Sequence, residues 1–363
     1  MERYYWAALQ TVPGLGNARL HMMVAYFGSA RQAWSAPRRD LFLCPAVDEA
    51  VGNNLLARRE KIDIHKMSAD WEKKGIGVVC AADDAFPARL RTIFDPPAVL
   101  YYRGRLPQDE LLIAVVGARK ASAYGKNAAT SLAADLAAAG VGVVSGAARG
   151  IDSAAHQGAL ERGGYTVAVL GCGVDVAYPP ENARLLSAIA EQGAIIAEYW
   201  PGTEPMAQFF PVRNRIISGL ARGVVVVEAA ARSGSLITAD WALEQGREVY
   251  AVPGSIFNAT SSGTNGLIKQ GAKLIEKAAD VLEDHGMANA NDKRAPATPP
   301  GDEGRVYGAL SYETPLTVEE LVMKVNLPAP VVTYILLQLE LKGLAAEFGG
   351  RRYIRLPGRE TGE

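Results

Sequence analysis

The sequence predicts an α/β protein built on a Rossmann-like, doubly wound and mostly parallel sheet, with a small helical domain before it and a winged helix after it. Two observations predict the sheet. From residue 111 onward, short apolar runs rich in β-branched residues alternate with stretches of helical spacing, as in βαβ units. Glycine is over-represented, at 37 of 363 residues against a usual share of about 7%. Much of it directly follows the apolar runs, where parallel sheets bind ligands.

Six apolar runs are expected to form parallel strands, because each is almost continuously hydrophobic, as strands buried on both faces are. They span residues 112–116, 141–144, 166–170, 194–197, 223–227 and 248–252. The helices expected between them span residues 124–139, 151–162, 183–191, 214–221 and 236–245. This central domain is expected to cover residues 76–284.

Residues 1–75 are expected to form a small all-α domain of the SAM or helix-hairpin-helix type, since apolar residues recur at helical spacing between turn signals. The turn Gly14-Leu15-Gly16 resembles a helix-hairpin-helix turn, in which backbone N–H groups face a DNA phosphate. A plain helix–helix turn is the alternative, because Lys and Arg outnumber Asp and Glu by only 11 to 8 over these residues.

Residues 285–302 are predicted to be a polar, Pro-rich linker, and residues 303–363 a winged-helix domain. Three helices are expected at 306–310, 317–324 and 330–342, followed by a hairpin formed by 344–348 and 351–356. Thr317, with Glu320 three residues later, is expected to cap the second helix. Six basic and six acidic residues lie between 303 and 356, so a docking module and a transcriptional reader of duplex DNA both remain open.

The charge of the whole chain gives no sign of a polyanionic partner, because 38 basic residues face 39 acidic ones. Any nucleic-acid surface must therefore be local. Segments 117–126 and 208–222 contain no acidic residue. The basic residues near strand ends are expected to converge on one face of the sheet: Arg119, Lys120, Lys126, Arg149, Arg213, Arg215 and Arg232. For any one of them, a structural ion pair with Glu181, Glu198 or Glu228 is the alternative.

Phosphate suits such strand ends, because backbone amides at glycine turns and arginine side chains supply directional donors without catalysis. The residues expected to hold phosphates are Gly117, Arg119, Lys120, Gly146, Arg149, Arg213, Asn214, Arg215, Ser233, Gly234 and Ser235. Three aromatic residues are expected to offer stacking platforms for bases: Tyr178, Phe209 and Phe210.

The sequence assembles no catalytic or metal centre. Asp152 and His156 lie at i and i+4 on an expected helix, but no third ligand accompanies them, so a structural role is expected. Cys172, between two glycines, is expected to fill a tight turn rather than to act as a nucleophile. Neither a G-x-G-x-x-G fingerprint nor a Walker lysine loop occurs, so no cofactor is expected.

The expected location is the cytoplasm, with no membrane segment. Cys44, Cys80 and Cys172 form no C-x-x-C pair, which favours a reducing compartment. The first residues lack the apolar core of a secretory signal, and no charge-free apolar run reaches the length of about 20 residues that a membrane span needs.

Six sequence blocks, in order and spacing, resemble the DNA-processing protein A family, also called DprA or Smf. The blocks are 116–119 (VGAR), 145–156 (SGAARGIDSAAH), 163–182 (GGYTVAVLGCGVDVAYPPEN), 210–219 (FPVRNRIISG), 233–239 (SGSLITA) and 252–255 (VPGS). The resemblance runs from about residue 76 to residue 282, and the flanking domains also match a known layout of the family.

The resemblance implies a non-catalytic protein that binds single-stranded DNA in a basic pocket of its Rossmann-like domain, with Arg119 as the pocket arginine. It also implies a homodimer that loads the RecA recombinase onto incoming DNA during natural transformation. Two departures are Ala118, where the family often has Ser, and Glu181, where some members carry a basic residue. Arg184 is the expected substitute for that phosphate contact. The family's dimer face corresponds here to Leu267, Ile268 and Leu274, which are equally consistent with core positions.

We therefore expect a single-stranded DNA-binding recombination mediator with no catalysis. The alternative is a nucleotide-processing enzyme of the phosphoribohydrolase type, which resembles this chain at the strand-end glycines. The Pro-Gly-Gly-x-Gly-Thr loop of those enzymes, with its downstream catalytic Glu, is replaced here by residues 253–257 (PGSIF).

Overall fold

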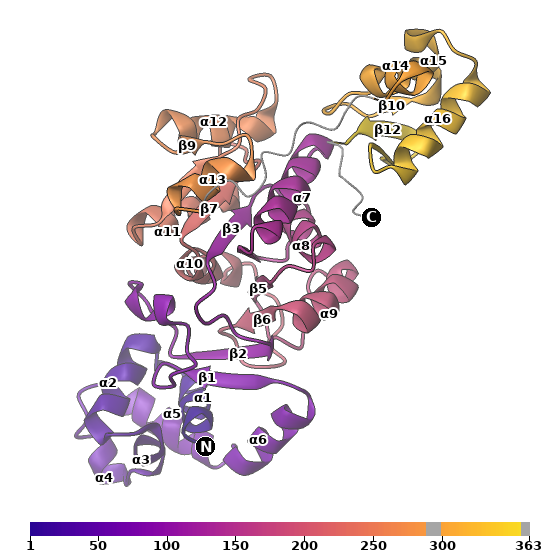
Figure 1. Ribbon diagram of the computed structural model, residues 1–363. Coiled ribbons are helices and arrows are strands. Elements are labelled where there is room, and N and C mark those ends of the chain that lie inside the picture. The colour runs from indigo at the N-terminus through magenta and orange to yellow at the C-terminus, as the bar shows by residue number, and fades with distance from the viewer. Residues whose placement is uncertain (288–298, 357–363) are drawn as a thin grey trace.

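A nine-stranded sheet forms the centre of the protein (Figure 1). The computed structural model describes residues 1–287 and 299–356. The strands lie in the order β1-β2-β6-β5-β4-β3-β7-β8-β9. Their bounds are β1 Gly77–Cys80, β2 Val99–Gly104, β3 Leu112–Val116, β4 Gly142–Ser145, β5 Thr166–Leu170, β6 Ala194–Ala197, β7 Gly223–Val226, β8 Glu248–Ala251 and β9 Lys273–Leu274. Strand β2 pairs antiparallel with β1 and β6, and every other neighbouring pair in this sheet is parallel.

The predicted α/β class and the doubly wound sheet are confirmed, with β3 to β8 at the six expected positions. Strands β1, β2 and β9 are additional and lie toward the two edges of the sheet. Strand β3 shows why its residues are almost all apolar. Ile113 and Val115 enter the hydrophobic cluster on one face, and Leu112, Ala114 and Val116 enter the cluster on the other.

Helices cover both faces of the sheet. Helices α7, α8 and α13 contribute to the cluster that contains Ile113, and helices α10, α11 and α12 contribute to the cluster that contains Ala114. The helices after β3 are α7 Ala123–Ala138, α8 Ile151–Glu161, α9 Ala183–Gln192, α10 Phe209–Leu220, α11 Gly234–Glu244, α12 Ser262–Lys269 and α13 Ala278–Asp284. Helix α10 begins at Phe209 rather than at residue 214, so both adjacent phenylalanines lie in its first turn.

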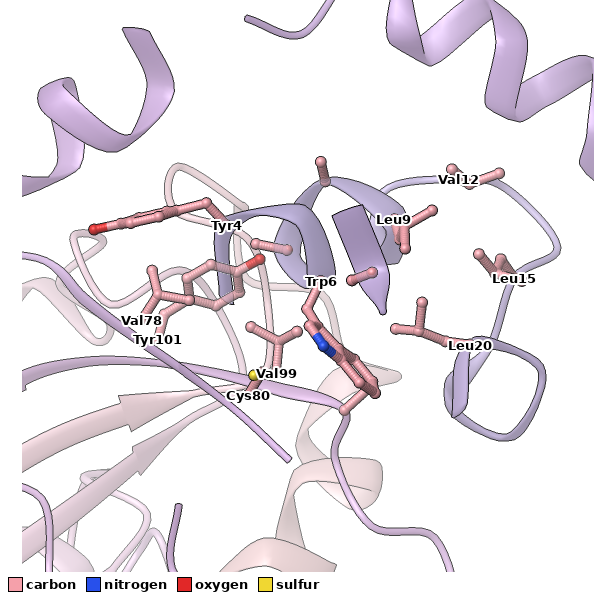
Figure 2. Packing of buried hydrophobic residues seen from close by; sticks show 14 of the residues in the cluster. Tyr4, Trp6, Leu9, Val12, Leu15, Leu20, Val78, Cys80, Val99 and Tyr101 are labelled. Atoms are coloured by element: carbon pink, nitrogen blue, oxygen red, sulfur yellow. The ribbon is translucent and has the colours of Figure 1, made fainter. Parts of the chain in front are cut away.

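The N-terminal helices pack directly onto the β1–β2 end of the sheet. They are α1 Glu2–Gln10, α2 Asn17–Phe27, α3 Ala30–Ser35, α4 Arg38–Leu41, α5 Glu49–Arg59 and α6 Ile64–Lys73. Figure 2 shows Tyr4 and Trp6 of α1 beside Val99 and Tyr101 of β2. On α6, Trp71 lies between Tyr101 and Trp200, with ring centroids 5.4 Å and 4.6 Å away. One hydrophobic core therefore joins the helices to the sheet.

The Gly14-Leu15-Gly16 turn lies between α1 and α2, as expected for a helical hairpin. Gly14 has a φ of +86°, and a Cβ at this position would lie 3.0 Å from Cγ2 of Val51 on α5. The side-chain amide of Asn54, also on α5, donates to the Pro13 carbonyl at 3.1 Å. The turn is thus fixed against a third helix.

The C-terminal residues fold into a winged helix around a core of their own. Its elements are α14 Gly301–Ala309, β10 Leu316–Thr317, α15 Val318–Val325, α16 Ala329–Leu341, β11 Ala345–Glu347 and β12 Arg352–Arg355. The predicted capping box is present, because Thr317 Oγ1 accepts from the Glu320 N–H and Glu320 Oε2 accepts from the Thr317 N–H. Most of the predicted linker, and residues 357–363 of the predicted winged-helix domain, lie outside the described residues.

Over residues 1–287 and 299–356, no single helix is long and apolar enough to cross a membrane. The bent pair of α15 and α16 passes that test only when its two helices are counted together.

Replacing Trp71 with Ala should lower the free energy of unfolding by about 3–5 kcal/mol, because a buried aromatic side chain at the junction of helix and sheet is lost. Urea unfolding followed by circular dichroism measures this. The control is Met22→Ala on α2, 54% exposed, which should change stability by about 0.5 kcal/mol or less. An equal loss of unfolding free energy in the two variants would contradict a core shared by the N-terminal helices and the sheet.

Candidate nucleic-acid interface

A groove runs along the carboxyl edge of the sheet, where the loops after β3, β4, β5 and β7 meet the start of α10. We define it by two adjoining cavities that share Arg119, Ala148, Phe210 and Arg213. The larger cavity is also lined by the predicted residues Gly117, Lys120, Asn214, Ser233, Gly234 and Ser235. The smaller is also lined by Gly146, Arg149 and Tyr178. Residues predicted from five separate segments are thus brought together.

Two glycines allow the loop after β3 to approach its neighbours closely. A Cβ on Gly117 would lie 2.6 Å from Cγ1 of Ile151, and Gly150, with a φ of +78°, would place a Cβ 2.3 Å from the Ala118 carbonyl oxygen. The Ile151 N–H donates to that same carbonyl at 3.2 Å. The loop is therefore seated on the start of α8, with the Arg119 side chain exposed at the edge.

Glu228, at the end of β7, holds the same loop from the other side. Its side chain is buried and accepts hydrogen bonds from the N–H of Ser122 at 2.9 Å and from the Ser122 hydroxyl. A Cβ on Gly125 would lie 2.4 Å from Glu228 Oε2, so this carboxylate also needs glycine in the first turn of α7. Glu228 thus binds neutral donors of the loop rather than one of the arginines.

Arg213 lies beneath the loop after β4, with only 4% of its surface exposed. Its Nη1 donates to the Gly146 carbonyl at 2.9 Å, and a Cβ on Gly146 would lie 2.5 Å from Nη2. Burial lowers the pKa of Arg213 to about 10, and the carboxylate of Asp152 opposes this shift. Burial raises the pKa of Asp152, with Arg213 opposing. Asp152 is the one acidic residue among the described residues that line the two cavities.

The three aromatic candidates differ in what they can offer a base. Phe210 lines both cavities, with the guanidinium carbon of Arg119 5.1 Å from its ring centroid and Tyr178 at 5.4 Å. Phe209 stacks on Tyr199 at 4.2 Å and lines neither cavity. Phe210 and Tyr178 therefore belong to the groove, and Phe209 packs outside it.

Arg215 does not reach the groove, which corrects its expected role as a phosphate contact and agrees with the alternative of a structural ion pair with Glu198. It is 2% exposed, and its guanidinium binds Asp95 at 3.1 Å and Glu198 at 2.7 Å. Burial alone lowers the pKa of Arg215, but these two carboxylates raise it above its usual value. Two residues along a helix correspond to a rotation of about 200°, so Arg213 and Arg215 face opposite sides of α10.

The other predicted basic residues lie on the surface. Arg149 is exposed at the rim of the smaller cavity and forms an ion pair with Glu181, as the alternative reading expected. Arg184 is exposed on α9 and is not among the residues that line either cavity. The predicted dimer residues divide between core and surface, because Leu267 is 7% exposed and Leu274 is 45% exposed.

His156 and Cys172 are buried close to the groove. His156 Nδ1 lies 2.8 Å from Thr166 Oγ1, and burial lowers the pKa of His156 to about 3. Burial raises the pKa of the Cys172 thiol to about 11, which disfavours the nucleophilic thiolate. Within the described parts of the chain, no group of three His, Cys, Asp or Glu residues is arranged to hold a metal ion.

Sequence reasoning missed the contribution of Asp152, a buried acid that lines the larger cavity and whose charge favours the charged form of Arg213. It also missed Thr260, which lines the larger cavity although it follows a different strand. Asp152 lies six residues after Gly146 in the block 145–156, and this spacing is the sequence signal that could have identified it. Thr260 has no comparable signal.

Helix α16 of the winged helix contains no lysine or arginine. Tyr334, Leu337 and Leu341 are 63%, 53% and 71% exposed on it. Winged helices that read duplex DNA place this helix in the major groove, where polar and basic side chains contact bases and phosphates. The exposed face of α16 therefore favours the docking module over the duplex reader.

Replacing Arg215 with Ala should destabilise the protein by about 3–5 kcal/mol, because the carboxylate of Glu198, whose side chain is 10% exposed, would lose its cationic partner and keep only the amide of Asn17. The matched change at the exposed Arg119 should cost about 1 kcal/mol or less. Thermal and urea unfolding of both variants test this difference. A stability loss at Arg119 as large as that at Arg215 would contradict the assignment of their roles.

Comparison with known proteins agrees with this architecture. The family model described as DNA recombination-mediator protein A matches residues 77–286, and a DprA winged helix domain matches residues 290–351. A putative DNA processing protein DprA from Mycobacterium tuberculosis is 39% identical over 373 residues, covering 95% of this chain and 92% of that protein. DprA from Streptococcus pneumoniae is 47% identical over 231 residues, covering 62% of this chain and 80% of that protein.

Two solved structures are also similar. The crystal structure of DprA from Streptococcus pneumoniae superposes with a TM-score of 0.69 at 37% identity, covering 78% of this chain and 98% of that one. DNA processing protein A from Helicobacter pylori, described for its single-stranded DNA binding mode, gives a TM-score of 0.52 at 28% identity over 58% and 95% of the two chains. Because one family model alone matches more than half of its residues, the chain belongs to the DNA-processing protein A (DprA/Smf) family.

Proposed function

We propose that this DprA/Smf family member binds single-stranded DNA in the groove, with successive phosphates held at Arg119, Lys120, Arg213 and the amides of the glycine loops. The observation that carries the proposal is the arrangement around Phe210. An exposed arginine and a buried arginine lie 5.1 Å and 6.0 Å from this one ring, between two cavities. Cationic side chains beside an aromatic ring are typical of sites that bind single strands.

The backbone at this edge supports the same reading. The start of α11 offers Ser233, Gly234 and Ser235 to the larger cavity, and helix starts favour anions. Burial raises the pKa of Asp152, the acid in the floor, which disfavours its negative charge, and the charge of Arg213 opposes this shift. The relative from Helicobacter pylori, described for its single-stranded DNA binding mode, supports extending this chemistry to the present chain.

We propose no catalytic step at this site. The groove acid Asp152 is buried, and Cys172 has a raised thiol pKa, so neither is a poised nucleophile. The loop after β8 also lacks the glycine-rich sequence of phosphoribohydrolases. These observations favour DNA binding over the nucleotide-processing alternative.

Replacing Arg119 with Ala should weaken binding of a labelled dT oligonucleotide at least 10-fold at low salt. It should also reduce the salt slope of the binding constant by about 0.7, because one phosphate contact with a single strand is lost. Fluorescence polarisation across a salt series, with duplex competitor, measures both. Arg39→Ala, at an exposed arginine on α4, is the control with no expected change. No binding by the wild-type protein, or unchanged binding by Arg119→Ala, would refute the proposal.

Self-association and RecA loading complete the proposal. Leu274 is exposed on the edge strand β9, and Ile268, six residues earlier on α12, is half-buried. An exposed apolar residue on a sheet edge suits a symmetric contact with a second copy. Leu267 supports this surface from the core.

Replacing Leu274 with Asp should convert a dimer to a monomer in light scattering and reduce stimulation of RecA filament assembly on single-stranded DNA. A charge at a symmetric apolar contact faces its own copy, which makes association unfavourable. Leu243→Asp, at a residue of α11 that is 60% exposed, tests whether the proposed dimer contact extends from β9 to α11. A Leu274→Asp variant that stays dimeric would contradict the proposed dimer contact. Wild-type protein that does not stimulate RecA filament assembly would contradict the proposed loading role.

A further inference from the structure

The loop after β8, residues 252–260, exposes two neighbouring apolar side chains. Ile256 is 84% exposed and Phe257 is 93% exposed. Residues 252–268 contain no charged residue. Because the loop follows a parallel strand, it opens at the same carboxyl edge as the groove, and its last residue, Thr260, lines the larger cavity. The exposed pair therefore continues the groove past β7.

This loop is well anchored at both ends, so its exposed tip is held in place. The side-chain amide of Asn265 donates to the Gly254 carbonyl at 3.0 Å, and its Oδ1 accepts from the Gly254 N–H at 3.3 Å. At the other end, the carbonyl of Thr260 accepts from the Ala229 N–H at 2.7 Å. An ordered loop that holds a phenylalanine in solvent suits contact with a partner.

One carboxylate links this loop to the loop of Arg119. Glu228 accepts from the Ser122 N–H at 2.9 Å and, at 3.3 Å, from the Thr260 hydroxyl, which shares its proton with Asn258 Oδ1 at 2.9 Å. The two loops thus have a fixed relation to each other. Strands β3, β7 and β8 are consecutive in the sheet. Neighbouring strands lie about 4.8 Å apart, so the ends of β3 and β8 are about 10 Å from each other. At about 3.4 Å per stacked nucleotide, a strand bound at Arg119 reaches the β8 loop within about three nucleotides.

The aromatic rings inside the groove are already in contact with protein groups. Phe210 contacts Arg119 and Tyr178, and Phe209 stacks on Tyr199. The ring of Phe257 has free faces, as its exposure shows. A base leaving the groove would find its open stacking surface here.

We propose that Phe257, with Ile256 beside it, is a stacking platform for a base of the single strand whose phosphates Arg119 binds. This inference rests on the proposed function and extends the binding path from the end of β5 to the end of β8. The ring supplies sequence-tolerant contact, because every base has a face that stacks.

Phe257→Ala should weaken the binding of a labelled dT20 oligonucleotide about 5- to 20-fold in fluorescence polarisation, the loss expected for one stacked base. Phe257→Trp should restore affinity. The matched control is Phe94→Ala, because Phe94 is also 93% exposed but precedes β2, away from the groove. In wild-type protein, dT20 carrying 5-iododeoxyuridine should photo-crosslink to Phe257, as located by mass spectrometry.

The outcomes separate this inference from the proposed function. Unchanged affinity in Phe257→Ala, with Arg119→Ala still defective, would overturn the platform and leave the groove intact. Wild-type protein that fails to bind dT20 would overturn both. Light scattering of Phe257→Ala tests whether the Phe257 ring contacts a second copy of this chain instead of a base. Conversion to a monomer with no crosslink at residue 257 would assign the ring to a second copy of this chain and overturn its role in stacking.

Discussion

The buried carboxylate of Glu228 is the interaction on which the carboxyl edge of the sheet depends. It lies at the end of β7, between the loop that carries Arg119 and the loop that carries Phe257, and it binds donors from both. The backbone carbonyl of the same residue accepts from the Ala118 N–H at 2.8 Å. A buried carboxylate is tolerated when its hydrogen bonds are satisfied. Here those bonds set the relative positions of the groups proposed to bind DNA.

Arg213 and Arg215 show how a chain of nearly zero net charge can hold a basic site. Both are buried on α10, yet one faces the groove beneath Gly146 and the other lies between two carboxylates. Only the first lines the site. The charges that decide function are therefore a small and oriented subset, and whole-chain charge averages over them.

Much of the fold could be predicted, because hydrophobic periodicity and glycine placement report directly on buried parallel strands. Strands β3 to β8 and the Thr317 capping box are local patterns of that kind. Strands β1 and β2 pair antiparallel with each other and precede the alternation of strands and helices, so the βαβ pattern carries no signal for them. The prediction for Arg215 was wrong for a different reason. The sequence leaves open an ion pair of Arg215 with Glu198, but its second partner, Asp95, lies 120 residues away and no local pattern links the two.

Because sequence patterns are local, they predict the residues of the groove more completely than the proposed contact at Phe257. Glycine turns and arginines identify phosphate sites through residue type alone. Phe257 and Asp152 become informative only when exposure and contacts are known, because an isolated phenylalanine is usually core and an aspartate in a helix is usually surface.

The two arginines of α10 also constrain the length of the chain. Each additional residue in a helix rotates everything beyond it by about 100°. Both guanidinium groups bind partners on opposite sides of the helix, so a single insertion or deletion near Phe210 would displace both together. Within α10 itself, gain or loss of one residue would remove the groove floor and the internal ion pair in a single event.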